Sequence, residues 1–103
     1  MKAVRDLKKN RLIEVEPKDN TLGYATAKAH YASIRDISKD EVISKPNVRA
    51  KVWKVEAERV VYAGDEVEIG EAGKVKVCTK EGTPIGVALT KAVKGEVASI
   101  RRM

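Results

Sequence analysis

A single histidine is the first candidate for chemistry in this chain. His30 lies between Ala29 and Tyr31. Acid–base catalysis or metal binding by an imidazole needs a partner side chain or further ligands, and the spacing of the sequence places none beside it. We therefore expect His30 to be structural or to face solvent.

The single cysteine is the second candidate. Cys78 follows Lys74 and Lys76 in strand phase, and neighbouring cations can lower the pKa of a thiol and make it reactive. Nothing in the sequence supplies a general base or a resolving thiol, so we expect a small residue at a strand edge or a subunit contact. One cysteine also excludes an intrachain disulfide, which is typical of a protein made and kept in a reducing interior.

Runs of like charge are the remaining candidates. Asp65, Glu66 and Glu68 form an acidic run, but a catalytic carboxylate pair would need a cleft, and a solvated hairpin is expected instead. Arg101 and Arg102 could bind phosphate, or equally be a solvent-exposed end or salt-bridge partners. Because no catalytic geometry emerges, we expect no enzymatic activity, cofactor, metal or small-molecule substrate.

The positive charge is concentrated at the two ends of the chain. The net charge is +6, and residues 1–11 hold five basic side chains and one acidic one, while residues 90–103 hold four and one. Such ends either contact an acidic partner or only keep the protein soluble. Trp53 lies on the Arg49 and Lys51 side of a regular strand, so it is either a core residue, which we favour, or an exposed interface anchor. The candidate contact residues are Lys2, Arg5, Lys8, Lys9, Arg11, Trp53, Arg101 and Arg102.

The composition fits one small domain. Apolar residues make up 43% of the chain and aromatic residues 4% with no Phe, so the core must rest on Val, Ile, Leu and Ala. Charged residues reach 35%, and the many Lys and Glu favour a thermostable protein. The start of the chain lacks the apolar region of a signal peptide, and no apolar run approaches the ~20 residues of a membrane span.

Glycine turns divide the last part of the chain into strands. Six of the seven glycines lie within 60–103, and glycine tolerates the left-handed backbone of tight turns. The fold class predicted is mainly β: a small antiparallel sandwich or barrel with an extended N-terminal arm and room for one short helix. The expected strands cover 67–69, 74–78, 85–89 and 97–100, with turns at 63–65, 70–73, 80–83 and 94–95.

The first half of the chain gives weaker signals. We expect a basic arm over residues 1–16 and a single β-rich domain over residues 17–103. Strands are predicted at 11–16 and 22–26. Residues 25–37 fit a helix or an irregular segment slightly better than a strand. The valines of 47–62 favour a strand over a helix.

The order of short motifs in residues 60–103 resembles that of the head decoration proteins of tailed bacteriophages, also called capsid cement or stabilisation proteins. The resemblance covers about 44 residues and continues into Arg101 and Arg102. The motifs are AGDEV at 63–67, GKV at 73–75, PIGVAL at 84–89 and AVKGEV at 92–97.

The resemblance implies a structural virion protein on the capsid surface, made in the host cytoplasm. Its partners would be the major capsid protein and two further copies of itself in a homotrimer, and it would stabilise the shell by bridging capsid subunits. No membrane partner is expected. Residues 1–16 would suit strand addition to a neighbouring sheet edge.

A small basic nucleic-acid-binding β-barrel is the alternative, supported by the net charge. Against it, Tyr24, Tyr31, Trp53 and Tyr62 are not grouped as a stacking platform requires. We therefore expect a protein partner rather than a nucleic acid.

Overall fold

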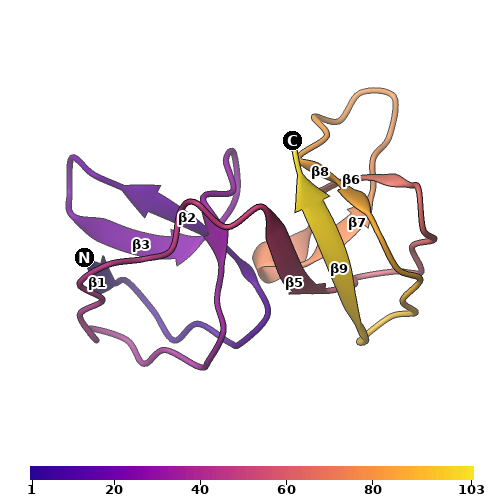
Figure 1. The fold of residues 1–103 in the computed structure, drawn as a ribbon. Coiled ribbons are helices and arrows are strands. Elements are labelled where there is room, and N and C mark those ends of the chain that lie inside the picture. Colours follow the sequence, from indigo (N-terminus) through magenta and orange to yellow (C-terminus); the bar gives the residue numbers. More distant parts are fainter.

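The computed structural model describes residues 1–103 as two β lobes lying side by side (Figure 1). Residues 1–50 form the first lobe and residues 51–103 the second, and the molecule measures 35 × 23 × 21 Å. No helix in it is long and apolar enough to cross a membrane. The strands of the first lobe are β1 (Lys2–Ala3), β2 (Leu12–Glu16), β3 (Thr21–Tyr24) and β4 (Tyr31–Ala32).

The first lobe is a four-stranded sheet in the order β1-β3-β2-β4. Strands β2 and β3 form a hairpin whose turn is the Pro17–Asn20 stretch, and Asn20 has a φ of 56° there. Asparagine tolerates this left-handed backbone better than most residues. Strand β1 joins the far side of β3 in parallel, and β4 pairs antiparallel with β2.

The second lobe is a five-stranded antiparallel sheet in the order β5-β9-β8-β6-β7. Its two outer strands curl towards each other, because the N–H of Glu58, just after β5, donates to the carbonyl of Val75 in β7 at 2.8 Å. The sheet therefore closes into a small barrel. Its elements are β5 (Val52–Glu56), β6 (Glu66–Ile69), the three-residue 3₁₀ turn η1 (Glu71–Gly73), β7 (Val75–Val77), β8 (Gly86–Ala88) and β9 (Val97–Arg102).

Each lobe has its own core, and the two cores meet at β2. The core of the second lobe is built of small and β-branched residues such as Val55, Val67 and Ile100, and it includes Leu12 and Ala25 from the first lobe. Because Leu12 of β2 and Ala25, just after β3, complete the barrel core, the two lobes are packed as one body.

The mainly β fold class is confirmed, and so are the strands and turns predicted for residues 60–103. The strand favoured within 47–62 is confirmed as β5. Of the helix or irregular segment favoured for 25–37, the helix is wrong, and the segment is irregular except where the two residues of β4 form. His30 N–H donates to the carbonyl of Ile13 at 2.9 Å, so pairing with β2 overrides the helix preference of the alanines.

The extended N-terminal arm is also wrong. Ala3 and Leu7 are fully buried in the core of the first lobe, and Leu7 exchanges two backbone hydrogen bonds of 2.8 Å with Ile37. The charged residues around Ala3 and Leu7 in the sequence suggested a solvent-exposed segment, although these two side chains face the core. The boundary expected at residue 16 cuts the β2–β3 hairpin, since β2 ends at Glu16.

Candidate protein-interaction surface

The four N-terminal lysines and arginines expected to contact a partner lie on the surface of the first lobe. Lys2, Arg5, Lys8 and Lys9 are all exposed. The guanidinium group of Arg5 lies over the ring of Tyr24, 4.9 Å from its centroid, and Lys2 is 3.7 Å from Asp40. These cations line a β surface, and they are not carried on a free arm.

Arg11, the fifth basic residue of this group, is buried between the lobes. Its Nη2 donates to the carboxylate of Glu56 at 3.2 Å, and its Nη1 donates to the carbonyl of Ala72 at 3.1 Å. Both groups belong to the second lobe. Arg11 therefore joins the two lobes and cannot reach a partner, which corrects the sequence-based assignment.

Trp53 is a core residue, as the favoured interpretation held. Its side chain is 3% exposed and belongs to the barrel core. The guanidinium group of Arg102 covers its ring at 4.9 Å and donates to the carbonyl of Val48 at 2.6 Å. Both residues therefore fasten the segment that connects the lobes, and Trp53 is not an exposed anchor.

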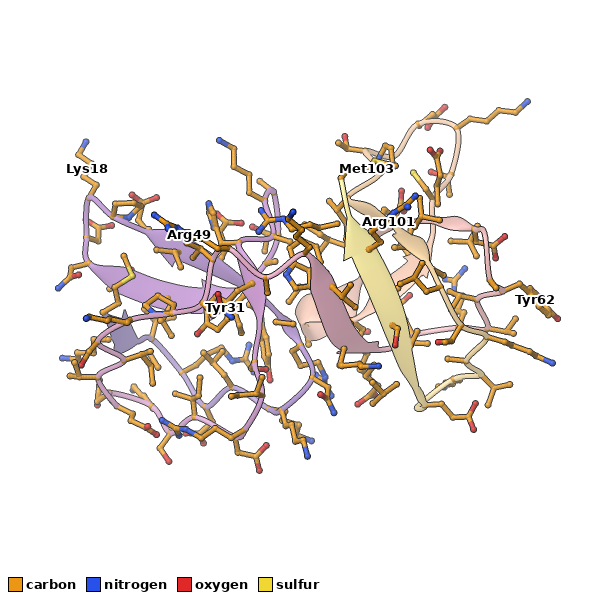
Figure 2. The ribbon with its side chains drawn as sticks, viewed as in Figure 1. Lys18, Tyr31, Arg49, Tyr62, Arg101 and Met103 are labelled. Atoms are coloured by element: carbon orange, nitrogen blue, oxygen red, sulfur yellow. The ribbon has the colours of Figure 1, made fainter.

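Arg101 is the remaining predicted residue, and it lies on the outside of the barrel (Figure 2). Strand alternation places Arg102 and Ile100 on one side of β9 and Arg101 on the other. Arg101 pairs with Val52 of β5 on one flank and with Val87 of β8 on the other. We call this the outer β5–β9–β8 face, formed by Val52, Lys54, Val87, Leu89, Val97, Ser99 and Arg101.

The outer β5–β9–β8 face exposes large apolar side chains. Val52, Leu89 and Val97 are 46%, 44% and 43% exposed. Leu89 sits opposite Ser99, to whose carbonyl its N–H donates at 2.8 Å, so Leu89 and Val97 are diagonal neighbours across β8 and β9. Exposed aliphatic groups among cations are suited to a protein partner, because such groups lose water favourably on contact.

The sequence pattern alone did not identify this face. The alternation of 85–89 does separate Ile85, Val87 and Leu89 from Gly86 and Ala88, but size would place the larger set inside. The structure does the reverse for Val87 and Leu89, because a Cβ at Gly86 would come within 2.6 Å of Ile100 and of the Arg101 carbonyl. Only the small set fits against β9, so Val87 and Leu89 face outward, whereas Ile85, just before β8, packs against the barrel core.

The other candidate groups have structural surroundings. Nδ1 of His30 accepts a hydrogen bond from the N–H of Val15 at 2.9 Å, so its expected structural role is confirmed. Asp65 closes the turn of the acidic run by accepting from Tyr62 N–H at 2.9 Å. No three His, Cys, Asp or Glu side chains come together in the arrangement of a metal site.

Burial raises the pKa of the Cys78 thiol, and the carboxylates of Glu68 and Glu66 raise it further. Lys76, one of the lysines in phase with Cys78, is 3.6 Å from Glu68. Its charge is therefore shared with that carboxylate. The lysine-activated thiol that the sequence allowed is not formed.

Comparisons with known proteins identify phage relatives. No protein-family model matches the chain. The "Capsid fiber protein" of Bacillus phage B103 and the "Head fiber protein" of Bacillus phage Nf are each 31% identical to it over 70 residues, or 68% of this chain. These residues cover 25% and 27% of those proteins, so the chain spans about a quarter of the length of the curated relatives it matches.

The fold matches that of a solved phage protein. The crystal structure of the N base of head fiber gp8.5 of bacteriophage phi29 superposes with a TM-score of 0.83 and 20% sequence identity. The match covers 99% of this chain and 89% of that one. The resemblance to head-associated phage proteins that residues 60–103 carry is confirmed by these relatives.

Proposed function

We propose that this protein is a structural component of a phage virion that binds the outside of the capsid as the base of a head fibre. The observation that carries the proposal is the match of 99% of the chain to the N base of a head fiber. The names of the two sequence relatives support the same location on the capsid surface.

We further propose that the protein bridges major capsid protein subunits as a homotrimer and thereby stabilises the shell. The outer β5–β9–β8 face supports this, because it offers aliphatic contact area beside Arg101 and Lys54. Three copies bound to neighbouring capsid subunits would combine modest contacts into a durable attachment. The role needs no reactive group, and we propose no enzymatic activity.

Binding to empty expanded shells of the corresponding phage tests the proposal. The purified protein is mixed with shells that lack it, and bound copies are counted by sedimentation and electron microscopy. Light scattering measures the mass of the free protein, and bound shells are compared with bare shells for resistance to heat. Shells without bound copies would refute the proposal, and bound shells no more resistant than bare ones would refute the stabilising role.

A salt titration of nucleic-acid binding separates the proposal from the nucleic-acid alternative. Tight binding with a steep salt dependence would favour the alternative. The surroundings of the aromatic residues favour a protein partner, since Trp53 and Tyr31 are buried and the exposed Tyr62 stands at the far end of the second lobe (Figure 2). A stacking platform needs exposed rings on adjacent strands.

A further inference from the structure

A groove of about 370 Å³ lies where the two lobes meet. One wall comes from β4 and the segment after it, including Tyr31 and Ile34, and the opposite wall comes from β5. Strands β4 and β5 are edge strands of different sheets. The groove therefore lies between two sheet edges, which are the parts of a β protein able to accept a further strand.

Two buried hydrogen-bond donors in the groove lining have no partner. The hydroxyl of Tyr31 and the indole N–H of Trp53 are unpaired, although the two side chains are only 7% and 3% exposed. Burial raises the pKa of the Tyr31 hydroxyl, so it keeps its proton at neutral pH. Buried polar groups in folded proteins are nearly always paired, so these two donors point to a bound acceptor.

Some backbone N–H and C=O groups of β5 also point towards the groove without a hydrogen-bond partner. The carbonyl of Lys51 accepts from Arg102 N–H at 3.0 Å, so alternate residues from Lys51 onward direct their backbone groups to β9. The residues between them face the first lobe, as the N–H of Glu56 does when it donates to the carbonyl of Asn10 at 2.9 Å.

The backbone N–H and C=O groups of Val52 and Lys54 point to the same side of β5 as those of Glu56, and both residues line the groove. Their N–H and C=O groups make no hydrogen bond within the chain. Two residues spaced in this way present the same pattern of donors and acceptors that β9 uses on the other flank of β5. An extended peptide could pair with this edge as an added strand.

The charge of the groove selects the kind of peptide. Its lining holds Arg35, Lys45 and Lys54 and no acidic residue. Arg35 is paired with Glu41 at 2.5 Å, and Lys54 bonds the hydroxyl of Ser99, whereas Lys45 makes no ion pair. A negatively charged guest would gain most from Lys45, whose charge is not paired within the protein.

We propose that this groove binds an extended acidic peptide segment of another polypeptide, which adds as a strand to the free edge of β5. Carbonyl or carboxylate oxygens of the guest accept from Tyr31 and Trp53, and its backbone pairs with Val52 and Lys54. The inference does not depend on the shell-binding role, because the isolated protein can bind such a peptide.

A peptide titration followed by nuclear magnetic resonance tests the proposal. The probe is a short capped peptide in which glutamate and valine alternate, and the control is the same peptide with lysine in place of glutamate. Trp53 is the only tryptophan, so its indole N–H gives one unambiguous signal. We expect this signal to move downfield and the amide signals of Val52 and Lys54 to shift saturably with the acidic peptide alone.

Variants separate the backbone contribution from the charge. Lys54→Ala removes one cation and should weaken binding by about threefold, whereas Lys54→Pro also removes an edge N–H and should weaken it by about tenfold. Tyr31→Phe removes a hydroxyl that has no partner within the protein and should weaken binding by about fivefold. If Lys54→Pro does not fold, Tyr31→Phe still tests whether the groove binds the peptide.

Three results would overturn the proposal. The first is the absence of a saturable shift of the Trp53 indole signal, and the second is an equal response to the acidic and basic peptides. The third is a shift of the same signals with protein concentration alone, which would identify a second copy of the chain as the occupant.

Discussion

The guanidinium group of Arg11 in the first lobe lies 3.2 Å from the carboxylate of Glu56 in the second. The pair is largely withdrawn from water, with side chains 7% and 26% exposed, and Lys74 stands 3.7 Å from the other oxygen of Glu56. Together with Leu12, which enters the barrel core, this contact joins the lobes.

Replacing Arg11 with alanine should lower the free energy of unfolding substantially. Breaking a buried pair from one side costs about 3–5 kcal/mol, and because Lys74 still neutralises Glu56 we expect about 2–3 kcal/mol. Urea denaturation measures the loss. Arg59→Ala is the control, since Arg59 is exposed and 3.7 Å from Glu58, and it should change stability by less than about 0.5 kcal/mol. Equal effects would contradict a role for Arg11 in joining the lobes.

Gly73→Ala should destabilise the protein more than Gly64→Ala. Both glycines have positive φ, 73° and 95°, so both substitutions strain the backbone by about 1 kcal/mol. A Cβ at Gly73 would also come within 2.5 Å of the Leu12 carbonyl, whereas a Cβ at Gly64 meets no atom within 4 Å. Thermal denaturation of the two variants isolates the close approach of the lobes at Gly73. Similar losses would mean that the contact can relax.

Glu14 should make stability depend on pH in the acid range. Hydrogen bonds from the N–H groups of Lys28, Thr26 and Ala27 lower the pKa of the Glu14 carboxyl, with the bond from Lys28 contributing most. A carboxyl with a lowered folded-state pKa stabilises the fold above its unfolded value of about 4.3, and this stability disappears as the pH falls through the folded value.

The variant Glu14→Gln tests this origin of the acid sensitivity. Its amide oxygen is a weaker acceptor, so we expect it to be less stable than wild type at neutral pH by about 1 kcal/mol. Below the folded-state pKa of Glu14 the two proteins should become nearly equal. Denaturant midpoints measured across the acid range would contradict the assignment if the difference stayed constant.

Cys78 should react slowly with thiol reagents. Burial and the nearby carboxylates raise the pKa of its thiol, so little thiolate is present at neutral pH. Glu68→Gln removes one of these carboxylates and should speed alkylation by iodoacetamide. Glu81→Gln, a substitution in the neighbouring turn, is the control and should leave the rate unchanged. If Glu68→Gln slowed the reaction, Glu68 would instead be assisting the thiol.

Reversing the charge of Arg101 should weaken attachment to shells. Arg101→Glu changes the centre of the outer β5–β9–β8 face and should lower affinity by about tenfold, since rearranged charge at a contact affects binding more than folding. Lys18→Glu makes the same change at the far tip of the first lobe (Figure 2) and should have little effect. Sedimentation with shells compares the two variants. Equal binding would show that another face is used.

The strands of the second lobe were predicted well because short stretches of sequence mark where each strand begins and ends. Glycine turns and alternating valines mark each strand within a few residues, and Val67 and Val75 are buried as their alternation indicates. The first lobe lacks such regularly spaced glycine turns. Ala3 and Leu7 are inward-facing residues separated by three exposed ones, and only their pairing with distant segments, such as Leu7 with Ile37, reveals them.

The interaction surfaces could not be predicted in the same way. Arg11 looked available because the sequence does not reveal that Glu56 lies beside it, and the sequence left Trp53 between a core residue and an exposed anchor. Tyr31 and Trp53 are far apart in the chain, and they line one groove only because two edge strands of different sheets meet. Such contacts depend on topology, which the period of a sequence does not specify.

Strand β9 lies between β5 and β8 and is hydrogen-bonded along both sides, whereas β1 is a two-residue strand at the rim of its sheet. Tension applied to residue 103 along β9 would load both ladders at once, in shear, so many bonds would have to fail together. Strand β1 is also bonded on both sides, to β3 and to the segment 40–43, but it has only two residues. Tension on residue 1 would therefore load fewer bonds than tension on residue 103.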